Sequence, residues 1–196
     1  MSVSVRYTRI AMLFHWLIAL LIFTNLLLAW TFDLVPDGWG RPAVDTHKSI
    51  GITVLGLVIM RLLWRLANPP PPLPASFPKL ERGAAHAVHI GLYVLMFAIP
   101  LSGWLHDSAW RDAATHPMQW FYLFQWPRIG FIMNLDPHFK EVLHGTFGRL
   151  HRWLAYVLYG LFVLHVAGAL KHSWWDRQSV LQRMLPWGRT RDNLKD

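Results

Sequence analysis

Four long stretches of this chain are almost free of charge, and they limit its fold more than any other feature. An α-helix rises 1.5 Å per residue, so about 20 apolar residues cross the roughly 30 Å hydrocarbon layer of a membrane. Only 15% of the residues are charged, against roughly 25% in an ordinary soluble domain. We therefore expect a single all-α domain, an integral membrane four-helix bundle over residues 1–196, with spans at about 10–32, 47–66, 83–106 and 148–170.

The first two spans each need a further argument. A cleaved signal peptide has an apolar region of about 7–15 residues that ends at a small-x-small site. The LAWT at residues 28–31 matches such a site poorly, so we expect 10–32 to be a span. The second span is long enough only if Arg61 and Arg65 extend toward the headgroups, and the prolines at 69–72 end it.

The distribution of basic residues predicts the orientation. Cytoplasmic loops are enriched in Lys and Arg. Both ends of the chain and the second connection are basic, whereas the first connection has Arg41 against three aspartates. We predict that both termini are cytoplasmic. In the long third connection, the aromatic stretch 118–133 contains Pro127 and Arg128, so we expect it to lie at the membrane surface without spanning.

Composition excludes several kinds of site. The chain has no cysteine, and therefore no disulfide, no thiolate-bound metal and no c-type haem attachment. Its net charge of +8 is explained by the orientation rule, and no recognition motif supports a nucleic-acid partner. Eleven histidines remain, several of them in apolar stretches, where an unpaired imidazole is unfavourable.

Four histidines sort into two layers by depth. His151 and His165 lie about four helical turns apart on the last span, so they share a face. His15 enters the first span level with His165, and His47 begins the second span level with His151. Two imidazoles from two helices suit a six-coordinate haem iron in a bundle core. We predict two haem b cofactors, stacked across the membrane, with these four histidines as the iron ligands.

The residue four positions after each of these histidines is small, which leaves clearance for a flat macrocycle on that helix face. His144 shares this property through Gly148 and is the main competitor for the outer site, but the depth pairing favours His151. The four small residues are Ala19, Gly51, Ala155 and Ala169.

Other side chains are expected beside the haems. His89, one turn after His86, is a candidate contact for a haem propionate or a quinone, with a plain interfacial role as the alternative. Arg61 and Arg65 are orientation anchors that would also neutralise a propionate. Three cations lie on the outer side, against the orientation rule, where they would attract an anionic donor or pair with propionates or lipid phosphates: Lys48, Arg149 and Arg152.

Five segments contain most of this pattern: LFHWLIALLIF, HKSIGITVLGLVIMRLLWRLANPPPP, AAHAVHIGLYVLMFAIPLSGWL, LHRWLAYVLYGLFVLH and RMLP. With them the chain resembles the bacterial cytochrome b561 family of four-helix dihaem membrane proteins. The resemblance implies haem ligation by His15, His47, His151 and His165, a place in the bacterial inner membrane, and electron exchange with quinone. Some members are similar to superoxide:quinone oxidoreductases, and others to haem subunits of dehydrogenases or hydrogenases.

Iron with both axial positions filled leaves one-electron transfer as its chemistry. We expect the chain to carry single electrons across the bilayer between quinone and an outer donor, either superoxide or a redox protein. The alternatives are a quinone-linked haem subunit of a larger dehydrogenase or hydrogenase, a histidine-based ion transporter, and a structural anchor. The absence of acidic residues within the spans disfavours the transporter.

Overall fold

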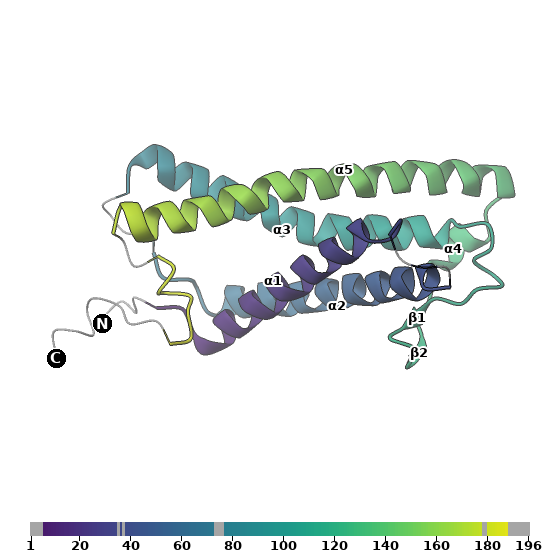
Figure 1. Ribbon diagram of the computed structural model, residues 1–196, viewed down its shortest axis with the longest axis horizontal. Helices are drawn as coiled ribbons and strands as arrows, with labels where there is room; N and C mark the ends of the chain where they lie inside the picture. Colours follow the sequence, from purple (N-terminus) through teal and green to yellow (C-terminus); the bar gives the residue numbers. More distant parts are fainter. Residues whose placement is uncertain (1–5, 35, 37, 73–76, 178–179, 188–196) are drawn as a thin grey trace.

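Four long helices form a bundle in the computed structural model, which describes residues 6–34, 36, 38–72, 77–177 and 180–187 (Figure 1). They are α1 (Arg9–Trp30), α2 (Gly40–Ala67), α3 (Lys79–Ser108) and α5 (Pro137–Leu170). The shorter elements are β1 (Gln119–Trp120), β2 (Phe124–Gln125), α4 (Gly130–Met133) and a π-helix, η1 (Lys171–Trp175), that continues α5.

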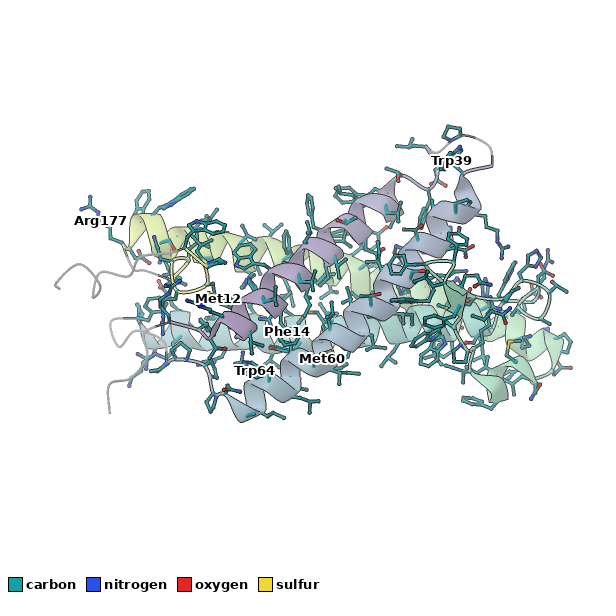
Figure 2. The ribbon with its side chains drawn as sticks, turned by 90° about the horizontal axis from the view of Figure 1, so that it is seen from below. Met12, Phe14, Trp39, Met60, Trp64 and Arg177 are labelled. Carbon is teal, nitrogen blue, oxygen red and sulfur yellow. The ribbon has the colours of Figure 1, made fainter. Side chains whose placement is uncertain are left out.

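The surface of the bundle is apolar. Each of the four helices is long and apolar enough to cross a membrane, yet only 6–22% of the residues in their most apolar stretches are buried. Side chains project outward all around the bundle (Figure 2), among them Leu13, Leu63 and Val163, each more than 60% exposed. A soluble bundle would bury such faces, whereas lipid solvates them. The predicted fold class is confirmed.

The helices extend beyond the uncharged stretches because charges near their ends are compensated. α2 begins at Gly40, well before His47, and its first turns contain the ion pair Arg41–Asp45, at 3.6 Å. α5 begins at Pro137, where Asp136 caps the helix by accepting hydrogen bonds from the next backbone N–H groups. Counting uncharged residues therefore located the membrane spans but underestimated the lengths of these helices.

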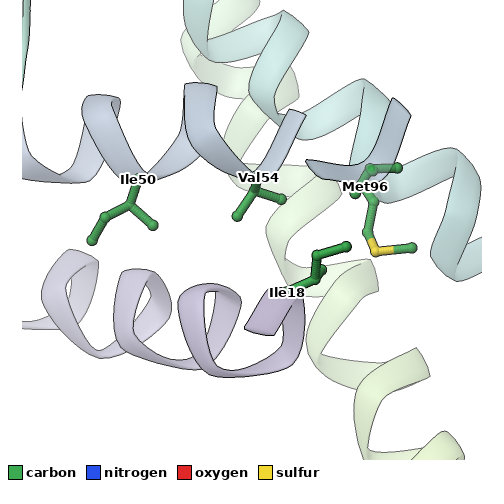
Figure 3. Close-up of a cluster of buried hydrophobic side chains, with 5 residues drawn as sticks. Ile18, Ile50, Val54 and Met96 are labelled. Carbon is green, nitrogen blue, oxygen red and sulfur yellow. The ribbon is translucent and has the colours of Figure 1, made fainter. Parts of the chain in front are cut away.

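A small core of buried side chains joins three helices (Figure 3). α1, α2 and α3 each contribute aliphatic side chains to it. Outside this core, α3 and α5 approach each other closely. A Cβ added to Gly91 of α3 would lie 2.7 Å from Leu161 Cδ1 of α5. The buried members of the core are Ile18, Ile50, Val54, Val58 and Met96.

The bundle has two different ends (Figure 1). α1 begins and α5 finishes at one end, which we call the terminal end. At the opposite end, the loop end, the third connection folds back on the bundle through the β1–β2 hairpin and α4. Residues 118–133 thus form short elements that do not span, as the sequence predicted.

Candidate functional site

At the loop end, His47 of α2 faces His151 of α5. Their ring centres are 6.1 Å apart and the ring planes cross at 77°. Nδ1 of His47 lies 3.3 Å from the backbone oxygen of Asn25, and Nδ1 of His151 lies 3.0 Å from that of Ile99. A carbonyl only accepts, so each Nδ1 donates and each Nε2 keeps its lone pair. This is the tautomer of a metal-binding histidine with a supporting partner.

α3 is shaped to hold the His151 ring. A Cβ on Gly103 would lie 3.1 Å from Cε1 of His151, which is tighter than ordinary contact. Ser102 Oγ also lies 3.1 Å from Nδ1 of His151 and bonds the Ile99 carbonyl at 2.8 Å. The absence of a side chain at Gly103 and the polar contacts beside it fix the position of the imidazole.

A cavity of about 920 Å³ surrounds the loop-end pair. All four long helices line it, and both predicted clearance residues of this layer, Gly51 and Ala155, are among the lining residues. Asn25 Oδ1 is buried there with no hydrogen-bond partner among the described residues. A large cavity between paired imidazoles, with a polar atom left over, is suited to a cofactor with polar substituents.

At the terminal end, His15 of α1 faces His165 of α5 with the same ring-centre distance, 6.1 Å, and a crossing angle of 70°. The ring centre of His89, from α3, lies 5.3 Å from that of His165. His86, one turn earlier, is exposed. The structure therefore brings His89 to the predicted site and leaves His86 outside it.

Arg61 and Arg65 also lie at the terminal end. Their guanidinium groups lie 5.6 and 5.5 Å from the ring centre of Tyr93. Arg61 Nη1 lies 3.1 Å from Nδ1 of His15. An arginine only donates, so Nδ1 of His15 accepts here and the ring proton is on Nε2. Iron ligation through Nε2 would need the other tautomer, with the proton moved to Nδ1, and this would free Arg61 to pair with an anion.

Both histidine pairs pass a simple metric test for one axially ligated metal. Two imidazole nitrogens, each about 2 Å from a metal ion, put the ring centres about 6 Å apart. The 6.1 Å spacing of both pairs matches this distance. The donor set contains imidazole only, as in bis-histidine haem sites. The residues therefore fit two haem groups.

His144, the competitor for the loop-end site, has a different partner. Its ring stacks on His106 of α3 at 3.8 Å, and Nδ1 of each ring bonds the backbone oxygen of the other residue, at 2.8 and 2.9 Å. The clearance at Gly148 accommodates His106, because a Cβ there would lie 2.9 Å from His106 Cε1. The ring opposite His47 is that of His151.

Of the three cations predicted to lie on the outer side, Lys48 differs from the other two. Its Nζ lies 2.8 Å from Asp107 Oδ1 and 3.4 Å from Asp45 Oδ1. Arg149 and Arg152 are exposed, and Arg152 lines the loop-end cavity. The charge of Lys48 is compensated within the protein, so Arg149 and Arg152 are the better placed of the three to attract an anion.

A cluster of acidic and imidazole groups at the terminal end has a structural explanation. Ligand atoms of Glu81, His172 and Asp176 lie within 4.8 Å of one another. Lys171 Nζ already bonds Glu81 at 2.9 Å and Asp176 at 3.1 Å. Hydrogen bonds from Lys171 and His172 lower the pKa of Asp176. The lysine thus supplies the positive charge that a metal ion would bring.

Comparison with known proteins decides the family. A sequence model described as prokaryotic cytochrome b561 matches residues 6–187. The chain belongs to this family. It is 38% identical over 183 residues to "Cytochrome b561 homolog 2" of Escherichia coli K12, covering 92% of this chain and 91% of the relative. It is 28% identical over 188 residues to "Probable superoxide oxidase CybB" of Yersinia pestis, covering 92% and 96%.

Membership makes the chain a multi-pass membrane protein of bacterial type and a b-type cytochrome that functions in electron transfer with haem b. Electron transfer is therefore supported over ion transport.

Sequence reasoning missed the residues that support the ligands. Gly103, Ser102 and the Ile99 carbonyl hold His151. Unlike histidine, these residue types do not indicate a metal site in a sequence. The SG pair at 102–103, next to Pro100 in an apolar span, was the available signal, because small residues allow close approach of membrane helices.

Proposed function

We propose that this cytochrome binds two haem b groups, at His15/His165 and His47/His151, and carries single electrons between an outer donor and quinone. The observation that supports it best is the equal ring-centre spacing, 6.1 Å, of two pairs at opposite ends of one bundle. Haem held in this way would supply one-electron chemistry. We place the loop end outside and both termini in the cytoplasm, following the basic-residue distribution.

Superoxide is the outer donor we favour. It is a small anion, and the exposed Arg149 and Arg152 flank His151 at the loop end. A relative named as a probable superoxide oxidase covers almost the same length of chain. The direct test is stopped-flow mixing of the purified holoprotein with superoxide, following haem absorbance and then quinone reduction. Haem that stays oxidised would rule out superoxide as the donor.

Replacing both Arg149 and Arg152 with glutamine should slow haem reduction by superoxide roughly tenfold at low salt, because cationic surfaces speed the encounter with anions. The difference should shrink as added salt screens the charges. Arg111→Gln is the control. Arg111 belongs to the third connection, is 86% exposed and is not among the residues that line the loop-end cavity. Equal rates for the double variant and the control would exclude steering by this pair.

We place the quinone at the terminal end. A cavity of about 230 Å³ lies there between α1, α2 and residues 180–187. Arg61 and Arg65 line it as donors suited to a quinone carbonyl oxygen. Tyr93 also lines it, and its buried hydroxyl has no hydrogen-bond partner among the described residues. The apolar lining, including Trp64 and Met184, suits a lipid-soluble ring.

Gly103→Val should displace the His151 ring, because even a Cβ at this position would lie 3.1 Å from Cε1. We expect a changed low-spin ferric signal from the loop-end haem in electron paramagnetic resonance, with an unchanged signal from the terminal-end haem. Gly160→Val is the matched control, since a Cβ on this α5 glycine meets nothing within 4 Å. Identical spectra for the two variants would contradict the role of Gly103.

A further inference from the structure

The β1–β2 hairpin is anchored to α2 close to the loop-end site. Ser49, which is 1% exposed, accepts a hydrogen bond from the Phe121 backbone N–H at 2.9 Å. Trp120 Nε1 donates to Thr53 Oγ1 at 3.1 Å. Ser49 follows His47 by two residues. The base of the hairpin is thus joined to the helix that presents a predicted iron ligand.

The tip of the hairpin has residues that its backbone geometry disfavours. Phe121 and Tyr122 both have positive φ, 47° and 60°, and the Leu123 N–H closes the turn on the Trp120 carbonyl at 2.9 Å. Asn and Gly are the residues that form such turns readily. The positive φ values do not favour the two aromatic residues at these positions, so any stabilisation by Phe121 and Tyr122 must come from what their side chains contact.

Only part of the surroundings of the tip is protein, since the rings of Phe121 and Phe124 each lie 5.1 Å from that of Trp120. Four consecutive apolar residues at the tip are exposed, and residues 117–127 contain no charged side chain. The hairpin projects sideways from the bundle beside α2, and does not extend beyond the helix ends (Figure 1). The tip consists of Phe121, Tyr122, Leu123 and Phe124, which are 38%, 62%, 73% and 49% exposed.

The height of the hairpin along α2 matches the outer part of the loop-end leaflet. Arg61 and Arg65 of α2 mark the interface at the terminal end, and the hydrocarbon layer spans about 20 helical residues. Counting back that distance along α2 from Arg61 and Arg65 reaches residues 41–45, so Ser49, where the hairpin is attached, lies about one to two turns inside the loop-end interface. An apolar tip that projects sideways at this level meets lipid close to the interface, where Tyr, Trp and Phe side chains are favoured.

We propose that the tip, residues 121–124, inserts into the lipid of the leaflet at the loop end. The occupant of this surface is the phospholipid bilayer, continuous with the lipid-facing surface of α2. The hairpin then acts as a lateral membrane anchor that braces α2 beside His47. This inference is independent of the identity of the electron donor and acceptor.

The cysteine-free chain allows a direct test with one spin label. Leu123→Cys in the holoprotein is labelled with a nitroxide and reconstituted into phosphatidylcholine vesicles, and the accessibility of the label to oxygen and to a water-soluble nickel chelate is measured. Thr115→Cys, exposed on the same connection, gives the aqueous reference, and Val163→Cys on α5 gives the lipid reference. We expect the oxygen-to-nickel ratio at position 123 to exceed that at 115 severalfold, toward that at 163.

Two results would overturn the proposal. A ratio equal to that at Thr115 would show that the tip lies in water. Dipolar broadening between labels on different molecules would show that a second copy covers it.

A second variant tests the aromatic side chains separately from the hairpin. Phe121→Asn with Tyr122→Gly supplies the residues that this turn prefers, so the hairpin should persist and the protein should fold. With the label at position 123, the oxygen-to-nickel ratio should fall toward the value at Thr115. An unchanged ratio would show that the aromatic tip does not hold the hairpin in lipid, and would refute the anchor.

Discussion

Replacing His151 with alanine is expected to halve the haem content, from two haem b per chain to the one held at the terminal end. His151 faces His47 with ring centres 6.1 Å apart, and its loss leaves the His47 imidazole without an opposite ring in a cavity of about 920 Å³. The pyridine haemochrome assay, referred to protein concentration, measures this directly. His165→Ala should have the complementary effect and leave only the loop-end haem.

His144→Ala is the matched control for His151→Ala. It removes an imidazole from the same helix, two turns away, but one that stacks on His106 and does not face His47. This variant should retain both haem groups. If His144→Ala lost haem and His151→Ala did not, the assignment of the loop-end ligand would be wrong.

The pairing of the histidines was predictable because helical geometry alone relates them. The spacing of His151 and His165 on one helix fixes two heights and one shared face. Uncharged length then sets the heights of His15 and His47. The structure brings together His15 with His165 and His47 with His151, as expected.

Contacts between segments distant in sequence were not predictable. The Lys48–Asp107 ion pair, at 2.8 Å, joins α2 to α3, and no periodicity in either helix indicates it. For the same reason Lys48 was expected from the sequence to attract an anionic donor or to pair with propionates or lipid phosphates. The contact of Arg61 with His15 likewise depends on how α1 and α2 cross. Local patterns give the faces and heights of helices, whereas the choice of partner depends on packing.

Asp107→Ala should lower the free energy of unfolding by about 3–5 kcal/mol, the cost of breaking a buried ion pair by removing one partner. The Asp107 carboxylate accepts from Lys48 and from Arg128, each at 2.8 Å, and the Asp107 and Arg128 side chains are both only 6% exposed. Arg128 also donates to the Ala113 and His116 carbonyls, so it fastens the third connection to the bundle. Without Asp107, two cations face each other with little solvent.

Denaturant unfolding in micelles, followed by haem absorbance and circular dichroism, measures the effect. Asp112→Ala is the control, because its pair with Arg111 is exposed, with 48% and 86% of the two side chains accessible, and such pairs contribute about 0–1 kcal/mol. Lys48→Met added to Asp107→Ala should recover part of the loss, since it removes one of the two cations left facing each other, and the double-mutant cycle isolates the coupling of Lys48 and Asp107. A double variant no more stable than Asp107→Ala would mean that Asp107 stabilises the protein through Arg128 and the third connection alone.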